Sequence, residues 1–326
     1  NPNAASGGAP FERFQPLLPT NQYGTATNSG ALTSWDFAYG ASYRDKFYLG
    51  AGLHFSKISA SSSTTWEDEF VGAKNVAGFQ YEEPLLTNGS GIALSLGGIY
   101  KVNPSLRLSL AFRSPTYYDQ MNETYDARLF PNVIGIPAIG STGNPITITK
   151  VNPMRLTTNE FTYQFLSPMK VSGGFALFFS KKGFLTADLE YVGYGGMRVY
   201  SAELGGSANQ AFQTKYNGQI ARNFEGALNI KVGSEIRISP SLSVRGGAAL
   251  FGGGYAASYD TIDRNALQFS GGIGYRKSNF YLDLTAIQRT QKDAYTPYTL
   301  KNTADFSSAT LDITTTQFML GGGIYF

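Results

Sequence analysis

The 326-residue chain contains no cysteine, only one histidine and only two tryptophans. Without cysteine, a disulfide framework and a thiolate metal site are both excluded. No apolar run approaches the 18 or so residues that a membrane-spanning helix needs. The net charge is only +3, and no run of basic residues points to nucleic acid as a partner. No metal site and no cofactor are expected.

Glycine and aromatic residues are abundant instead, with 38 Gly, 21 Tyr and 23 Phe. This composition favours many strands joined by tight turns and disfavours long helices. Apolar and polar residues alternate with a period of two from residue 34 onward; in 225–239, for example, Leu228, Ile230 and Val232 alternate with Asn229 and Lys231. The alternation predicts eleven strands, near 34–44, 47–58, 91–102, 106–119, 168–180, 184–194, 225–239, 242–255, 266–276, 280–290 and 316–326.

Short and long connections alternate strictly between these strands. The short ones have two or three residues, and the long ones are 59–90, 120–167, 195–224, 256–265 and 291–315. A soluble sandwich can also have one wet face, but it has no reason to place every long loop at one end. Long outer loops and short periplasmic turns are typical of a transmembrane β-barrel, in which closure pairs every backbone group. We therefore predict an all-β fold, an antiparallel outer-membrane β-barrel over 34–326.

The two ends of the chain differ. The last residues, TQFMLGGGIYF, continue the alternation up to Phe326, as a closing barrel strand does. If Phe326 faces the periplasm, eleven strands place residue 34 outside the cell, whereas single-chain bacterial barrels have an even strand number. Residues 1–33 show no alternation, and the chain opens without an initiator methionine or signal peptide. We expect 1–33 to be an extracellular loop that follows missing N-terminal strands.

Three blocks carry a family resemblance. They are 91–119, with Phe112-Arg113-Ser114-Pro115; 166–199, with Asp188, Tyr191 and Tyr194; and 223–255, with Gly233 and Arg245. Their order and the loop lengths between them resemble the FadL-type transporters of long-chain fatty acids and other hydrophobic compounds. The resemblance implies the last eleven of fourteen strands, without the N-terminal hatch and the first three strands. It also implies an outer-membrane location and passive uptake through the barrel lumen.

Two of the long loops, 59–90 and 120–167, contain apolar segments. Exposed apolar patches often mark binding surfaces, and in the resembled family the matching loops form an outer groove that collects substrate. Alternatively, these residues only pack the loops together. The candidate groove residues are Phe70, Val71, Val76, Phe79, Leu129, Phe130, Val133, Ile134, Ile136 and Ile139.

Four cations are predicted to face the lumen: Arg113, Lys170, Arg237 and Arg245. Arginine matches the geometry of a carboxylate head group, so any of them could meet a fatty acid. The alternative is that they form cross-strand ion pairs with acidic residues such as Asp188, Glu190 and Glu235, as opposite charges in sheets commonly do.

Catalysis is not expected. A Ser-His-Asp site would require the single histidine, His54, beside a serine, and a lone lumen-facing histidine is more often a satisfied polar residue. The prediction is an outer-membrane transporter that takes up fatty acids or other small hydrophobic molecules. Its expected partners are the hydrophobic ligand, outer-membrane lipid and lipopolysaccharide, and other outer-membrane proteins. The alternatives are a scaffold or docking subunit of a larger secretion complex and, less favoured, a barrel enzyme such as a phospholipase.

Overall fold

A computed structural model describes residues 19–180, 182–259, 261–296 and 308–325. Successive strands pair antiparallel in one large sheet, and its eleven principal strands correspond to the eleven predicted ones. The prediction of an all-β antiparallel fold is confirmed. These strands are β1 (Asn21–Tyr43), β2 (Phe47–Glu69), β3 (Val76–Lys101), β4 (Leu106–Arg113), β11 (Lys170–Phe178), β12 (Gly183–Gly193), β14 (Gly226–Arg237), β15 (Leu242–Phe251), β16 (Ala266–Arg276), β17 (Phe280–Tyr295) and β18 (Ala309–Ile324).

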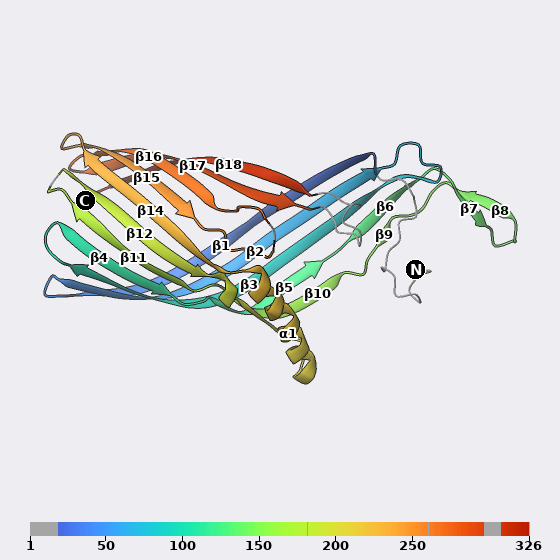
Figure 1. Cartoon of the computed structure of the whole chain (residues 1–326), viewed down its shortest axis with the longest axis horizontal. Helices are drawn as coiled ribbons and strands as arrows, with labels where there is room; N and C mark the ends of the chain where they lie inside the picture. The colour runs from blue at the N-terminus through green and yellow to red at the C-terminus, as the bar shows by residue number, and fades with distance from the viewer. Residues whose placement is uncertain (1–18, 181, 260, 297–307, 326) are drawn as a thin grey trace.

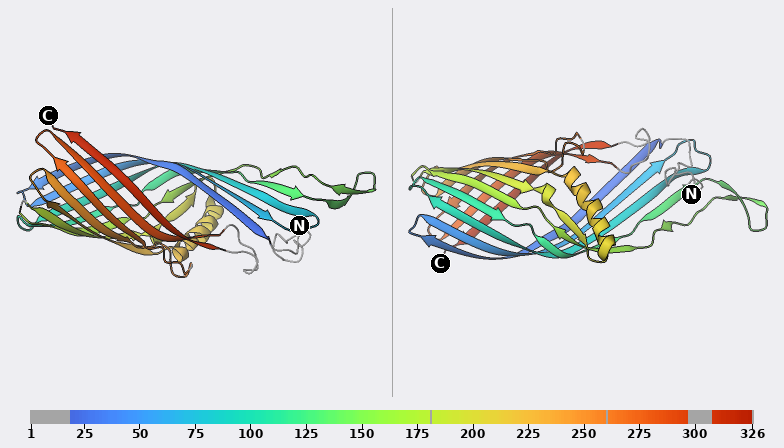
Figure 2. Two further views of the ribbon diagram at one scale, coloured as in Figure 1. Left: turned by 90° about the horizontal axis from the view of Figure 1, so that it is seen from above. Right: turned by 60° about the horizontal axis from the view of Figure 1, so that its bottom comes forward.

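The sheet curls so that its first and last strands approach each other toward one end (Figures 1 and 2). There, the rings of Trp66 in β2 and Tyr295 in β17 meet edge to face, with centroids 6.0 Å apart. A side chain at Gly24 would crowd this contact, because its Cβ would lie 2.9 Å from the Tyr295 hydroxyl. Among the described residues, β1 pairs only with β2 and β18 only with β17, so side chains rather than a ladder join these two ends.

The first strand is much longer than predicted. β1 begins at Asn21 and pairs with β2 in an unbroken register from Asn21–Glu69 to Tyr43–Phe47. The interpretation of 21–33 as a loop is therefore wrong. Serine, threonine, asparagine and glycine occupy both faces there, so apolar alternation is lost although the backbone ladder continues. Residues 1–18 of the predicted loop lie outside the described residues.

Two of the predicted long loops consist largely of strand. β2 and β3 extend through 59–90 and leave 70–75 as their connection. The segment 120–167 contains β5 (Tyr117–Tyr125), β6 (Arg128–Val133), β7 (Ile136–Ile139), β8 (Pro145–Ile148), β9 (Met154–Arg155) and β10 (Asn159–Leu166). β5 continues the course of β4 along β3, and β7 and β8 form a separate hairpin. The long connections lie toward one end of the molecule and the short turns at the other (Figure 1).

The remaining long connections are more varied. The segment 195–224 includes most of a 3-10 turn (Tyr194–Gly196), β13 (Arg198–Ser201) and α1 (Gly206–Asn223). In 291–315, β17 runs on to Tyr295 and β18 starts at Ala309, while 297–307 lies outside the described residues. Among the described residues, no helix is long and apolar enough to cross a membrane.

Helix α1 covers an edge of the sheet through two asparagine side chains. The Asn217 amide accepts a hydrogen bond from the Val199 N–H (2.8 Å) and donates one to the Val199 carbonyl (3.1 Å). Asn209 makes the same pair of contacts with Ser201, at 3.2 and 3.4 Å. The two asparagines are eight residues apart, so they lie on one helix face. The two amide side chains make the hydrogen bonds that a neighbouring strand would otherwise make with the backbone of β13.

Candidate functional site

One face of the sheet carries charged residues from β1 round to β17. Register partners connect Asp36 with His54, Gly52 with Ser95, Ser95 with Arg113, and Arg113 with Lys170. Because directly opposite residues share a face, one continuous surface bears Asp36, His54, Ser95, Arg113 and Lys170. We call this face the inner face, and these five residues the inner polar row. On the opposite face, apolar residues such as Phe318 are exposed.

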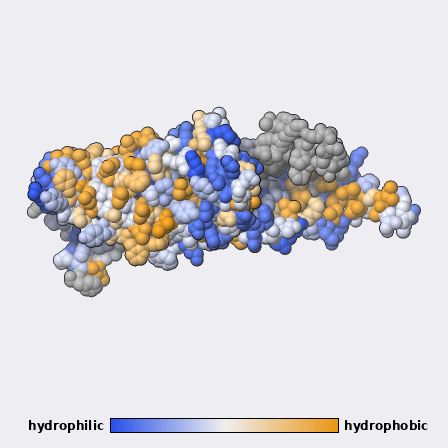
Figure 3. All heavy atoms as spheres, turned by 90° about the horizontal axis from the view of Figure 1, so that it is seen from below, coloured by the Kyte–Doolittle hydropathy of each residue, from blue (hydrophilic) through white to orange (hydrophobic). Residues whose placement is uncertain are grey.

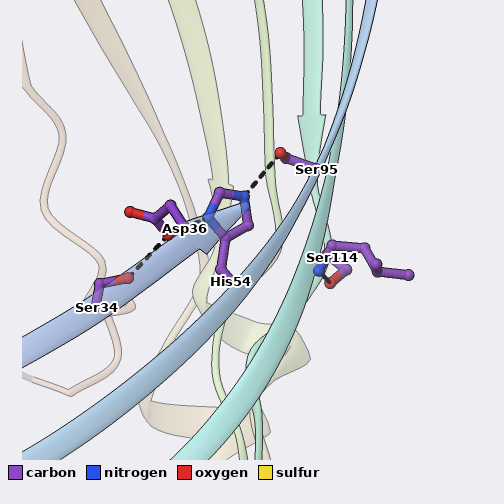
Figure 4. A network of polar contacts seen from close by, with 6 residues as sticks. Ser34, Asp36, His54, Ser95 and Ser114 are labelled. Atoms are coloured by element: carbon purple, nitrogen blue, oxygen red, sulfur yellow. Dashed lines mark hydrogen bonds and ion pairs between the residues drawn. The ribbon is translucent and has the colours of Figure 1, made fainter. Parts of the chain in front are cut away.

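His54 lies at the centre of a short chain of polar contacts (Figure 4). Its Nδ1 is 2.5 Å from Asp36 Oδ1, and its Nε2 is 2.7 Å from Ser95 Oγ. The Ser34 hydroxyl donates a second hydrogen bond to the Asp36 carboxylate, at 2.9 Å. A carboxylate can only accept, so Nδ1 carries a proton, and in that tautomer Nε2 is the acceptor for the serine hydroxyl. The histidine is satisfied, as expected, and one of its partners is a serine.

The contact between His54 and Ser95 was not found by sequence reasoning. Alternation places both side chains on the inner face, but the two residues are not directly opposite. Ser95 faces Gly52, so it meets His54 diagonally. That contact depends on the exact β2–β3 register, which alternation alone does not determine. Among the described residues, no group of three or more histidine, aspartate or glutamate side chains is placed to hold a metal ion.

The four predicted lumen cations differ in their partners. Arg245 donates to Glu235 (2.7 Å) and to Asp283 (2.8 Å), so it belongs to a cross-strand ion-pair network. Arg237 lines a cavity of about 260 Å³ together with these three residues. Among the described residues, no ion pair is formed by Arg113 or Lys170, which are register partners on β4 and β11. Arg237 likewise forms no ion pair among the described residues, and Arg113 and Lys170 differ from it in lying opposite each other within the inner polar row.

The two predicted groove loops meet as paired strands rather than as irregular loops. β3 and β6 pair antiparallel, and Phe79 opposes Pro131 while Tyr81 opposes Leu129. Since β3 is unbroken from Val76 to Lys101, Phe79 shares the inner face with Ser95. The Phe70 ring lies 6.2 Å from that of Phe79. We call this group the outer apolar cluster: Phe70, Val76, Phe79, Leu129 and Val133.

The other groove candidates lie elsewhere. Phe130 opposes Gln80 and so faces away from Phe79. Val71 and Ile134 are in connections and are 66% and 50% exposed. Ile136 and Ile139 belong to the β7–β8 hairpin, which projects at the far end of the molecule (Figure 1). The structure thus brings together half of the predicted set.

Aromatic side chains and two carboxylates lie between the outer apolar cluster and the inner polar row. The Tyr81 and Tyr125 hydroxyls bond Glu83, and the Tyr163 hydroxyl bonds Glu123 at 2.8 Å. Trp66 stacks on Tyr81 with ring centroids 6.3 Å apart. Further along the same face, Met121 and Tyr118 fill the space beside Gly89 and Gly91 and are 4% and 6% exposed. We call Trp66, Tyr81, Met121 and Tyr118 the inner apolar path. Sequence reasoning missed the path, because half of its members come from β5, in a segment expected to be a loop.

Comparison with known proteins bears on the fold. Neither a protein-family model nor a curated protein matches the chain. A FadL homologue from Pseudomonas aeruginosa superposes with a TM-score of 0.53 at 12% identity, over 92% of this chain and 67% of that one. The fold is FadL-like. The toluene transporter TbuX from Ralstonia pickettii aligns over 94% of this chain and 69% of that one, at 14% identity and a TM-score of 0.48.

Within the FadL-like sheet, one acidic residue ties the outer strands β6 and β9 together. Arg128 and Arg155 are register partners, and like charges in such positions repel. Asp126 accepts two hydrogen bonds from Arg155, at 3.0 and 2.7 Å, and one from Arg128 at 3.2 Å. The hydrogen bonds from Arg155, helped by those from Arg128, lower the pKa of Asp126. The contribution of these contacts to the stability of the folded protein is complete above the ordinary carboxyl pKa of about 4. It is lost as the pH falls through the lower pKa that Asp126 has in the folded protein.

Replacing Asp126 should therefore expose Arg155 to trypsin. At trypsin's neutral working pH the wild-type carboxylate is charged and holds the guanidinium that the protease must bind. We expect Asp126→Asn to raise the rate of cleavage after Arg155 several-fold, measured by mass spectrometry of timed digests. Asp119→Asn is the control, because in the described structure Asp119 bonds Tyr117 and Gln164 and no arginine. Equal rates in wild type and Asp126→Asn would contradict this role.

Proposed function

We propose that the protein is a bacterial outer-membrane channel for the passive uptake of small hydrophobic molecules. The observation that supports this most is the continuous inner face, on which the outer apolar cluster, the inner apolar path and the inner polar row follow one another. The FadL-like fold agrees with it, and the solved structures of similar fold include a toluene transporter. An apolar molecule would move along the aromatic side chains of this face, past the tyrosine-bonded carboxylates of Glu83 and Glu123.

The outward face suits contact with membrane lipid and, at its outer edge, with lipopolysaccharide. Phe318, Leu320 and Ile324 of β18 are 77%, 75% and 71% exposed. Figure 3 shows hydrophobic side chains spread over the half of the molecule that carries the short turns, with a hydrophilic zone near the middle. A hydrophobic band bounded by polar surface is the pattern of a barrel wall in lipid.

We propose long-chain fatty acids as the substrates of this face. Transfer of an acyl chain from water to an apolar surface is worth about 0.8 kcal/mol per methylene. The inner apolar path would supply that surface, and Arg113 with Lys170 would receive the carboxylate, because neither forms an ion pair among the described residues. Neutral molecules such as toluene would use the same path without the cations.

Neighbouring residues on opposite faces of β6 test the capture site. Leu129→Asp puts a charge into the outer apolar cluster, whereas Phe130→Asp puts the same charge on the other face. We expect Leu129→Asp to lower uptake of labelled oleate and toluene about tenfold, and Phe130→Asp to leave it within about twofold. Uptake is measured in cells that lack the wild-type gene. If both variants transport like wild type, capture on the inner face is wrong.

Arg113 and Lys170 test the nature of the substrate. Arg113→Gln and Lys170→Gln remove positive charge and keep most of the side-chain volume. We expect both variants to take up oleate several-fold more slowly and toluene at the wild-type rate, so each variant carries its own control. Equal loss for both molecules would indicate damage to the barrel, and no loss for oleate would exclude a carboxylate site here.

A docking role is the second candidate, and the β7–β8 hairpin favours it. The hairpin pairs only with itself among the described residues and projects from the long-loop end (Figure 1). It presents Ile139 and Ile146, which are 78% and 46% exposed. Such a surface fits an outer-membrane partner protein. We expect the double variant Ile139→Asp, Ile146→Asp to lose a partner that co-purifies with wild type while oleate uptake persists. Unchanged co-purification would remove this role.

A further inference from the structure

The contacts around His54 have the order that nucleophilic catalysis requires. The Ser95 hydroxyl is hydrogen-bonded to one ring nitrogen, and the Asp36 carboxylate is hydrogen-bonded to the other. This arrangement lets the imidazole take a proton from the serine while the carboxylate holds the ring and stabilises its positive charge. The three residues come from β1, β2 and β3, so two hydrogen-bonded ladders hold them in place. Ser34 in turn fixes the carboxylate of Asp36.

We propose that Ser95, His54 and Asp36 hydrolyse carboxylic esters inside the barrel, an activity beyond uptake. Ser95 is the nucleophile, His54 is the general base and acid, and Asp36 is a positioning residue that acts through His54. The substrates are esters with an apolar acyl chain, because the inner apolar path borders the site on the same face. Acyl chains lying along Tyr118 and Met121 would bring their carbonyl carbon to Ser95.

The reaction runs in two steps. Ser95 Oγ attacks the ester carbonyl carbon, and its proton passes to His54 Nε2. The bond from the carbonyl carbon to the alcohol oxygen then breaks, and the alcohol leaves with that proton. Water next attacks the acyl-serine, giving one proton to His54 Nε2, and the acid leaves as the Ser95 oxygen recovers the proton. Ester and water become acid and alcohol, with no other reactant.

Arg113 is placed to stabilise the negative oxygen that forms in each step. It is the register partner of Ser95, and side chains in such positions start about 4.5–5.5 Å apart at Cβ. Backbone N–H groups in a strand are used by the ladder, so a charged side chain supplies the stabilisation that backbone donors give elsewhere. Lys170, the next residue along the inner polar row, adds positive charge that suits the carboxylate product.

Gly52 leaves the space that the ester carbonyl needs. A Cβ at this position would lie 2.7 Å from Ser95 Oγ and 3.2 Å from His54 Nε2. Any larger residue would separate the nucleophile from its base. The side chain of His54 is 15% exposed and that of Asp36 is 53% exposed, so the site is open to solvent from the inner face. Water for the second step can therefore reach the acyl-serine.

A fluorophosphonate probe tests the nucleophile directly, with the full chain purified in detergent. We expect mass spectrometry to find the phosphonate adduct on Ser95, and no adduct in Ser95→Ala or His54→Gln. The matched control is Ser270→Ala. This serine shares the inner face on β16, and within the described part of the chain its hydroxyl bonds the Gly247 carbonyl at 3.5 Å and no histidine, so the control should label like wild type. An adduct that persists in Ser95→Ala would overturn the assignment.

Hydrolysis of p-nitrophenyl octanoate provides the rate. We expect Ser95→Ala to fall to the background rate and His54→Gln to lose about 10²- to 10⁴-fold, the usual contribution of a positioned base. Asp36→Asn should lower kcat by a similar factor and leave KM unchanged, because it acts through His54 and does not touch the ester. Gly52→Ala should also lose the activity. Circular dichroism and heat-modified gel migration establish that each variant is folded.

Two outcomes would overturn the proposal: a wild-type rate no higher than that of Ser95→Ala, or a folded His54→Gln protein that keeps full activity. Uptake is a separate measurement. Toluene has no ester bond, so its uptake in Ser95→Ala cells should match wild type whether or not the protein hydrolyses esters. Loss of ester hydrolysis with normal toluene uptake would thus leave the channel proposal intact. Conversely, if cells with the wild-type protein take up no toluene but the purified protein hydrolyses the ester, the channel proposal fails and the hydrolase proposal remains.

Discussion

The antiparallel hydrogen-bond ladder between successive strands is the constraint on which the rest of the structure depends. The side chains of a strand alternate between the two faces of the sheet. Residues that are register partners lie on the same face, so the register of an unbroken ladder determines which residues of the next strand face inward. β3 illustrates this over 26 residues, since it puts Phe79 at one end and Ser95 near the other on the same face. The positions of the inner polar row and of Val76, Phe79, Leu129 and Val133 follow from register, whereas Phe70, Val71 and Ile134 lie in connections.

The inner face has two polar regions with different charge arrangements. Around Arg245, one guanidinium lies between two carboxylates from β14 and β17, so each carboxylate has a cationic partner. In the other region, Arg113 and Lys170 lie next to His54, whose ring nitrogens contact Asp36 and Ser95. The apolar path ends at this second region. One face thus carries both the aromatic side chains of the inner apolar path and the inner polar row.

Much of the fold could be predicted from the sequence, because lipid-facing alternation and two-residue turns are local signals. The course of 21–33 and of 59–90 could not, since residues such as Thr25, Ser61 and Thr64 lie beyond the apolar part of the strands and carry no face preference. Helix α1 has no buried residue and only a weak apolar stripe. Its anchorage by Asn209 and Asn217 is a tertiary contact without a sequence pattern. The contact between His54 and Ser95 is diagonal and depends on register, which strand prediction does not supply.

The pairing order also bears on how the chain reaches this state. β1 with β2, β3 with β4, β11 with β12, β14 with β15, and β16 with β17 are hairpins with tight turns, so each closes a short loop at little entropic cost. Such units form quickly and can add to a growing sheet in chain order. The ring contact between Trp66 and Tyr295 is of the opposite kind, because it joins residues separated by most of the sequence. It can form only after β17 has joined the sheet, so no early hairpin can contain it.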